Sequence, residues 1–210
     1  MNRPLILLLA LLSLTACSSV QRPPIQHDVS IAAIQAQQSR LQKLTDWQLR
    51  GQMALFDLQQ QDRHSMYVEW QATPTQLKMR FYHPLRGTLA RLEQTPAGAI
   101  LIAEDGTHYQ ATTMDELLWE YFRLELPINQ MSAIISGREQ PQMMDKSYQL
   151  QSVNDESLAL LAGFVMPASG QLWQGQLQQY KSTNGVYLPH LIELSSKQWR
   201  LKLQVSKWQF

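Results

Sequence analysis

The side chains that could support acid–base or metal chemistry are few and widely spaced along this chain of 210 residues. Neighbouring carboxylates occur at Asp115–Glu116 and Asp155–Glu156, where helix capping and turn solvation explain them better than proton transfer does. The chain contains no Gly-x-Ser-x-Gly elbow, glycine-rich phosphate loop or His-Glu-x-x-His motif. The histidines are scattered without ligand spacing, at His27, His64, His83, His108 and His190. We therefore predict no enzyme, no metal site and no cofactor.

The single cysteine, Cys17, is the exception, because its position favours a specific covalent chemistry. A basic residue at Arg3, an apolar run over residues 5–12 and small residues precede it, which is the layout of a secretory signal peptide. The run is too short to span a bilayer with ease. Residues 14–17 read LTAC and resemble the bacterial lipobox, after which the cysteine becomes the new N-terminus and carries lipid on its thiol and amine. The alternative is a free or buried thiol that merely follows a signal peptide.

Lipidation at Cys17 predicts the organisation of the rest of the chain. Two or more acyl chains anchor a protein stably, whereas one gives marginal binding. Ser18 stands where inner-membrane lipoproteins often carry Asp, which favours the outer membrane, with the protein facing the periplasm. We predict a signal peptide over residues 1–16, a lipidated tether over 17–29, in which Pro23–Pro24 blocks helix formation, and one domain over 30–210.

An apolar residue at a turn is the second unusual feature. Residues 81–92, FYHPLRGTLARL, join two apolar-alternating segments through Pro84, Leu85, Arg86 and Gly87. Turns usually take Gly, Pro, Asn, Asp or Ser, so the leucine requires a reason. From the residues alone, Leu85 either folds back on the sheet or is one more scattered apolar surface residue.

Composition describes an ordinary globular chain. It is 44% hydrophobic, and 18 Lys and Arg balance 17 Asp and Glu for a net charge of +1, without a basic stripe. We therefore predict no binding to nucleic acid. With one cysteine, an internal disulfide and a multi-thiolate metal site are both excluded.

Periodicity predicts a helix, a set of strands, two helices and a second set of strands. A helix capped by Ser30 should run to about Leu44. Thr113 and Glu116 predict a capping box for a second helix, and Pro127 starts a third that ends before Gly137. Strands with a two-residue period are predicted over 48–58, 65–71, 76–82, 88–94, 99–103, 107–111, 149–153, 158–165, 170–180, 188–195 and 199–208. This order predicts a single α+β unit, in which an antiparallel sheet carries helices on one side.

The predicted sheet has more apolar surface than three short helices can cover. A curved sheet with helices across its open side encloses an apolar interior, which side chains need not fill. The chain has nine methionines, whose flexible side chains suit an interior that accepts varied acyl groups. A tightly packed core with methionine as filler is the alternative, and composition alone favours it.

An ordered set of segments resembles the LolB family of outer-membrane lipoproteins. The set comprises the lipobox, LRGQMAL, SMYVEWQ, HPLRGTLARL, DGTHYQA, ELPINQM and KLQVSKW, and it spans nearly all of the mature chain. The resemblance implies a curved, incompletely closed antiparallel β-barrel with about three helices as a lid over an apolar cavity. It implies an acceptor that takes acylated lipoproteins from the periplasmic carrier LolA and inserts them into the outer membrane without an energy source, as a monomer.

The resemblance also implies roles for residues. The family's protruding loop carries Pro-Leu-Gly, whose leucine contacts the membrane, and Pro84 and Leu85 match it. Arg86 replaces the family's glycine, which is displaced to Gly87, and the arginine is free to pair with lipid phosphates. The acyl-chain cavity is predicted instead from inward-facing periodicity, and each of its members is equally suited to a filled core: Trp70, Met79, Phe81, Leu101, Leu118, Phe122, Met131 and Ile134. Ile134 stands where the family usually carries Trp, which changes the shape of the lid. A non-catalytic outer-membrane lipoprotein that scaffolds envelope assembly or binds another lipid is the alternative.

Overall fold

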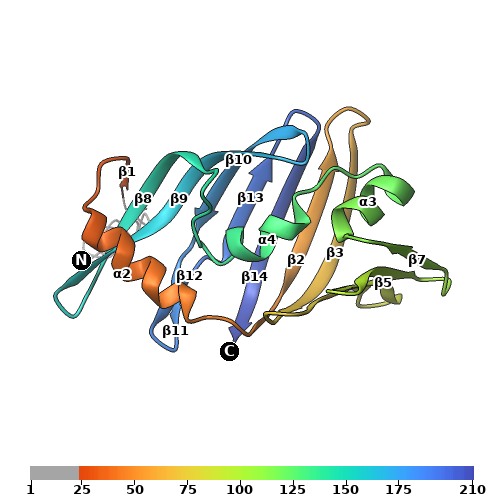
Figure 1. Cartoon of the computed structure of the whole chain (residues 1–210), viewed down its shortest axis with the longest axis horizontal. Coiled ribbons are helices and arrows are strands. Elements are labelled where there is room, and N and C mark those ends of the chain that lie inside the picture. The colour runs from red at the N-terminus through yellow and green to blue at the C-terminus, as the bar shows by residue number, and fades with distance from the viewer. Residues whose placement is uncertain (1–23) are drawn as a thin grey trace, which may run out of the picture.

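The computed structural model describes residues 24–210, and the predicted signal peptide and Cys17 lie outside this part of the chain. One antiparallel sheet of 12 strands forms its body, in the order β1-β8-β9-β10-β13-β14-β2-β3-β4-β5-β6-β7 (Figure 1). Its strands are β1 (Ile25–Gln26), β2 (Trp47–Asp57), β3 (Asp62–Ala72), β4 (Leu77–His83), β5 (Gly87–Thr95), β6 (Gly98–Ala103), β7 (His108–Ala111), β8 (Met144–Val153), β9 (Glu156–Ala168), β10 (Gln171–Gln178), β13 (Leu191–Ser195) and β14 (Trp199–Gln209). A separate hairpin pairs β11 (Lys181–Thr183) with β12 (Val186–Leu188).

Three helices of the described residues accompany the sheet, and α2 and α4 cross in front of it in Figure 1. They are α2 (Ile31–Gln42), α3 (Met114–Phe122) and α4 (Ile128–Ile134). The strands β1 and β7 form the two ends of the sheet order and do not pair with each other, so the barrel is incompletely closed. The predicted fold class is therefore confirmed. None of the helices in residues 24–210 has the length and apolar composition to cross a bilayer.

Alternating side chains explain why these segments are strands. In β14 the residues Trp199, Leu201, Leu203 and Val205 are buried while their neighbours are exposed, as the two-residue period predicts. Each strand thus contributes one apolar face to a core that is continuous across the sheet. Burial of these faces is the main stabilising contribution, at roughly 25 cal/mol per Å² of apolar surface.

The helix starts follow the predicted capping chemistry in part. The Ser30 side chain accepts a hydrogen bond from the Ala33 backbone N–H at 3.2 Å, and Thr113 accepts one from Glu116 at the same distance. In a capping box the Glu116 carboxylate would accept a hydrogen bond from the Thr113 backbone N–H. Here it accepts one from the Thr112 backbone N–H instead. Pro127 is the N-cap of α4 rather than its first helical residue.

The shortest strands were not predicted from the sequence. Ile25 and Gln26, which we assigned to the tether, pair with β8, so part of that segment belongs to the sheet. The β11–β12 hairpin was also missed, and β8 begins at Met144, five residues before its predicted start at Gln149. Two- and three-residue strands have too few alternating positions to show a period, and only their partners identify them.

Candidate functional site

An apolar cavity lies between the inner face of the sheet and the helical cover. Its volume is about 170 Å³, and every side chain that lines it is apolar. The lining consists of Met53, Leu55, Met66, Met79, Phe81, Ala90, Leu92, Leu101, Leu118, Phe122, Leu124, Leu126, Ile128 and Leu201. Such a surface suits hydrocarbon, and it presents no acid, base or nucleophile for catalysis.

The floor of the cavity follows directly from strand register. Met53 lies opposite Met66, Met79 opposite Leu92, and Leu92 opposite Leu101. Residues opposite one another on neighbouring strands project from the same face, so β2 to β6 supply one continuous apolar surface. Three of the lining residues are methionines, whose unbranched side chains adapt to contents of different shape.

The cover of the cavity consists of α3 and the segment that leads into α4. Leu118 and Phe122 project from one side of α3, and Leu124, Leu126 and Ile128 continue the apolar lining. The helix ends at Arg123, which has a left-handed backbone with φ +56 and lets Leu124 donate a hydrogen bond to the Leu118 carbonyl at 3.1 Å. This end turns the chain back across the sheet. The remaining helix, α2, contributes no residue to the lining and contacts β9 instead.

One polar contact joins the two covering helices. The Asp115 carboxylate of α3 accepts a hydrogen bond from the Asn129 side-chain amide at 2.9 Å and a longer one from the Asn129 backbone N–H at 3.4 Å. Burial raises the pKa of Asp115 above its ordinary value of 3.8, because desolvation outweighs these stabilising hydrogen bonds. The Asp115 carboxylate of α3 therefore binds the first turn of α4, a helix whose own N-cap residue makes no side-chain hydrogen bond.

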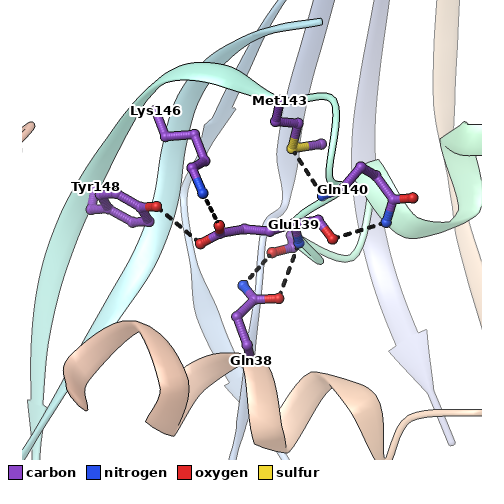
Figure 2. A network of polar contacts seen from close by, with 7 residues as sticks. Gln38, Glu139, Gln140, Met143, Lys146 and Tyr148 are labelled. Carbon is purple, nitrogen blue, oxygen red and sulfur yellow. Dashed lines mark hydrogen bonds and ion pairs between the residues drawn. The ribbon is translucent and has the colours of Figure 1, made fainter. Parts of the chain in front are cut away.

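The chain that follows α4 is held by a larger polar network, shown in Figure 2. Glu139 forms an ion pair with Lys146 and accepts a hydrogen bond from the Tyr148 hydroxyl at 3.0 Å. The Gln38 side chain of α2 accepts from the Glu139 N–H at 3.0 Å and donates to the Gly137 carbonyl at 3.1 Å. Gly137 is required at this helix end because its φ is +83, and an added Cβ would meet the Tyr180 hydroxyl at 2.9 Å. The network therefore connects α2, the end of α4 and β8.

The structure brings five of the eight predicted cavity residues together. Met79, Phe81, Leu101, Leu118 and Phe122 line the cavity. Trp70, Met131 and Ile134 do not reach it, and all three are fully buried in the surrounding core. Periodicity identifies an inward face, but it cannot separate residues that border a void from residues that contact only other side chains.

Several lining residues were missed in the sequence. Leu124 and Leu126 lie in the connection between α3 and α4, outside the predicted elements, and Ile128 is the first residue of α4, from which only Met131 and Ile134 were predicted to line the cavity. Met53, Leu55 and Leu201 lie on strands whose inward faces were visible, but their place at the cavity depends on which strands are neighbours. The LEL-PI sequence over residues 124–128 was the available signal, since an apolar residue recurs at every second position.

The predicted loop protrudes from the hairpin of β4 and β5. Leu85 is 92% exposed, the highest value among the exposed large apolar residues of the described chain. It therefore does not fold back on the sheet. Pro84 and Leu85 are the central residues of a turn that the Arg86 N–H closes by donating to the His83 carbonyl at 3.2 Å, and Gly87 completes it with φ +83. Gly87 thus supplies the left-handed residue of this turn.

The side chains around the loop tip are polar. The His83 Nδ1 atom accepts a hydrogen bond from the Leu85 N–H at 3.2 Å. The Arg86 guanidinium pairs with the Glu104 carboxylate of the neighbouring turn at 2.7 Å, and both side chains are largely exposed. The base of the hairpin borders the cavity, since Phe81 and Ala90 lie opposite each other, two residue pairs separate them from the turn, and both line the cavity. Phe122 of the cover is 40% exposed at this side. The cavity and the exposed leucine are therefore close neighbours.

Two further predictions from the sequence concern Cys17 and metal binding. Cys17 is outside the described residues, so the structure carries no information on its lipidation. Within residues 24–210, no three His, Cys, Asp or Glu side chains gather in a group that could hold a metal ion.

Comparison with known proteins adds to this geometry. The family model described as outer membrane lipoprotein LolB matches residues 45–208. The outer-membrane lipoprotein LolB of Psychromonas ingrahamii is 27% identical over 94% of this chain and 91% of its own length. The protein of the same name from Haemophilus ducreyi is 27% identical over 95% of this chain and 94% of its own, and that from Ectopseudomonas mendocina is 26% identical over 100% and 97%.

Solved structures share the fold at low identity. A LolA superfamily protein from Nitrosomonas europaea superposes with a TM-score of 0.54 and 8% identity, covering 86% of this chain and 94% of its own. A putative outer membrane lipoprotein-sorting protein domain from Vibrio parahaemolyticus gives a TM-score of 0.50 and 10% identity, over 82% and 90%. At these identities the likeness concerns the fold alone.

Proposed function

The chain belongs to the LolB family of outer-membrane lipoproteins, and on that premise we propose that it accepts acylated lipoproteins from the periplasmic carrier LolA and inserts them into the outer membrane. The proposal depends above all on the cavity, because its lining is entirely apolar and it adjoins a fully exposed leucine. A protein that only scaffolds partners gains nothing from a hydrocarbon-lined void, which forfeits packing contacts.

The cavity must enlarge to admit cargo. Its volume of about 170 Å³ is below the roughly 300–1,000 Å³ of typical ligand sites, and lipoprotein acyl chains are large ligands. In our proposal the cover over β2 to β6 moves. The reason is that, among the described residues, the only side-chain hydrogen bonds between α3 and α4 are those between Asp115 and Asn129. The network at Glu139 holds the other end of α4 in place.

Transfer proceeds downhill in free energy. The chain has no nucleotide-binding motif, so acyl chains pass from LolA to the cavity and on to lipid as each site binds them better. Each methylene that avoids exposure to water saves about 0.8 kcal/mol, which makes a direct passage from cavity to cavity strongly favoured. The process needs no catalytic residue and no cofactor.

Leu85 is the membrane contact in this mechanism. A leucine held in water costs about 1.5–3 kcal/mol relative to a buried one, and it regains that free energy on entering the bilayer. A gain of this size allows the loop to touch the inner leaflet and leave again. The lipidated Cys17 provides the permanent anchor, which keeps the protein, a monomer in this proposal, at the periplasmic side of the outer membrane.

The test is transfer of an acylated lipoprotein from LolA to a soluble Cys17→Ala form, followed by release into liposomes. We expect acceptance without added energy, since the cavity and its cover remain. In the same background, Leu85→Glu should keep acceptance and lose release, because a charged tip does not enter hydrocarbon. Failure of acceptance by the folded protein would refute the proposed function. Equal release by Leu85→Glu and its parent would remove the role of the loop alone.

A further inference from the structure

The outer face of β14, β2 and β3 carries an organised set of side chains that the cavity does not use. Strand register places them in three rows, each crossing the three strands in the order β14, β2, β3. The rows are Gln204–Gln52–Tyr67, Lys202–Ala54–Ser65 and Arg200–Phe56–Arg63. The last row lies at the end of the strands, next to the turn between β2 and β3.

The middle row forms a groove. Ala54 and Ser65 have short side chains, whereas the rows on either side carry aromatic rings and guanidinium groups. The resulting groove has a volume of about 320 Å³, and Arg63, Lys202 and His83 stand on its walls. Its floor carries the short side chains of Ala54 and Ser65, and its walls combine uncharged polar side chains with the unpaired guanidinium of Arg63.

The last row holds two guanidinium groups without a carboxylate partner. Arg63 and Arg200 stack over the Phe56 ring at 5.3 and 4.3 Å from its centre, and neither forms an ion pair with any described residue. On the same outer face, Lys78 and Lys202 each pair with a glutamate, Arg50 and Arg80 share Glu69, and Arg91 and Lys207 form no ion pair with any described residue.

The acids of the β2–β3 hairpin are engaged elsewhere. Asp57 is buried and accepts hydrogen bonds from the backbone N–H groups of Gln59 and Gln60. Asp62 pairs with His64 at 3.1 Å, on the face of β3 opposite to Arg63. The positive charge of the two arginines is therefore available to an anion.

This charge lies at the same end of the strands as the exposed loop. Tyr67 of β3 is opposite Tyr82 of β4, and continuing this antiparallel register by two residues brings Pro84, at the start of the turn, level with Ser65. Leu58, at the turn beyond Phe56, is a second exposed apolar side chain, with 43% of its surface accessible. Apolar tips beside free cations match the layers of a bilayer surface, where phosphates lie just above the hydrocarbon.

We propose that Arg63, Arg200 and the groove beside them bind the phosphate groups of anionic phospholipid when the Leu85 loop enters the membrane. This inference rests on the proposed function, because it uses the loop to set the orientation. The guanidinium groups are already held in place by Phe56, so little side-chain freedom is lost when each meets a phosphate oxygen. The site would hold the cavity mouth at the bilayer while cargo leaves.

The experiment measures binding of the soluble Cys17→Ala form to vesicles, without cargo, by co-sedimentation. Vesicles of phosphatidylethanolamine alone are compared with vesicles that contain phosphatidylglycerol. We expect Arg63→Gln with Arg200→Gln to weaken binding to the anionic vesicles by roughly 25-fold, about fivefold per charge, and to leave binding to the neutral ones unchanged. Lys43→Gln with Lys207→Gln is the matched control, since it removes the same charge from exposed lysines at the other end of the strands.

A conservative variant separates charge from folding. Arg63→Lys with Arg200→Lys should retain most of the affinity, and wild-type thermal unfolding of each variant confirms an intact sheet. Equal losses in the glutamine variant and in the lysine control would show a general charge effect and overturn the proposal, as would no loss in the glutamine variant. Binding of inorganic phosphate that is lost in the glutamine variant, together with an unchanged preference of that variant for anionic vesicles, would indicate a free-anion site and also overturn it.

The outcome is independent of cargo transfer. Loss of vesicle binding with normal acceptance from LolA supports the site and the proposed function together. Normal vesicle selectivity in a protein that accepts no cargo would refute the proposed function and leave the lipid site standing.

Discussion

Both halves of the sheet pair their strands antiparallel, but one half has an interior filled by side chains and the other half contains a cavity. In the half formed by β8, β9, β10 and β13, large side chains such as Trp173, Leu177 and Tyr148 are buried, and α2 covers β9. In the half formed by β2 to β6, a cavity remains under α3. The helical cover shows a similar contrast. A polar network around Glu139 fixes the C-terminal end of α4, whereas the single carboxylate of Asp115 joins its N-terminal end to α3. In the proposed function, this difference keeps one half rigid and leaves the other half open to change when acyl chains enter.

Removal of a large side chain should separate the halves most clearly. Trp173→Ala leaves a void in the filled half and should lower the free energy of unfolding by about 3–5 kcal/mol. Phe122→Ala removes a side chain that is 40% exposed and already borders a cavity, so the loss should be about 1 kcal/mol. Urea unfolding of both variants measures the difference. Similar losses would mean that the two halves are equally packed in solution.

The network at Glu139 should be the stronger of two ion pairs. Glu139→Gln leaves Lys146 without its charged partner in a half-buried site and should lower the free energy of unfolding by about 2 kcal/mol. Glu104→Gln removes the largely exposed partner of Arg86 and should change it by less than about 0.5 kcal/mol. Urea unfolding again compares the two. An equally small effect at Glu139 would show that the network does not hold this end of α4.

Filling the cavity should affect binding more than stability. Ala90→Leu places extra methyl groups in a cavity of about 170 Å³ and should weaken binding of a fluorescent fatty acid by about tenfold or more. The exposed Ala97→Leu adds the same apolar group outside the cavity and should leave the affinity unchanged. Fluorescence titration gives both values. Unchanged affinity in Ala90→Leu would place the acyl chain elsewhere.

The smallest expected effect concerns pH at the junction of α3 and α4. The raised pKa of Asp115 means that the folded state binds its proton more tightly than the unfolded state does, so this group's contribution to stability is lost as the pH rises above 3.8. Asp115→Asn keeps a hydrogen-bond acceptor for Asn129 but cannot ionise, so the variant does not lose this stability as the pH rises. The stability of wild type relative to the variant should therefore fall as the pH rises from about 4 and level off once the pH exceeds the raised pKa of Asp115. Unfolding curves across this range test it, and a constant difference would contradict the raised pKa.

Much of the fold could be predicted because its signals are local. The alternation in residues 65–71 and 76–82 and the caps Ser30 and Thr113 all indicated elements that the structure contains. The loop at Leu85 was recognisable because an apolar residue occupied a turn position. The site was predicted less completely. Met79 and Phe81 were identified from their faces, whereas Trp70 and Ile134 had the same pattern and lie buried outside the cavity.

By itself, the sequence determined which residues face inward along each strand, where the helices begin, and that a leucine stands at a turn, because each depends on neighbours a few positions away. Only the tertiary structure decided where a void remains, which arginines lack an acid, and that Leu85 and Arg63 lie at the same end of the sheet. These properties arise from the register and order of strands that are distant along the chain. A cavity is the volume left by all the packed side chains together, so no single segment can encode it.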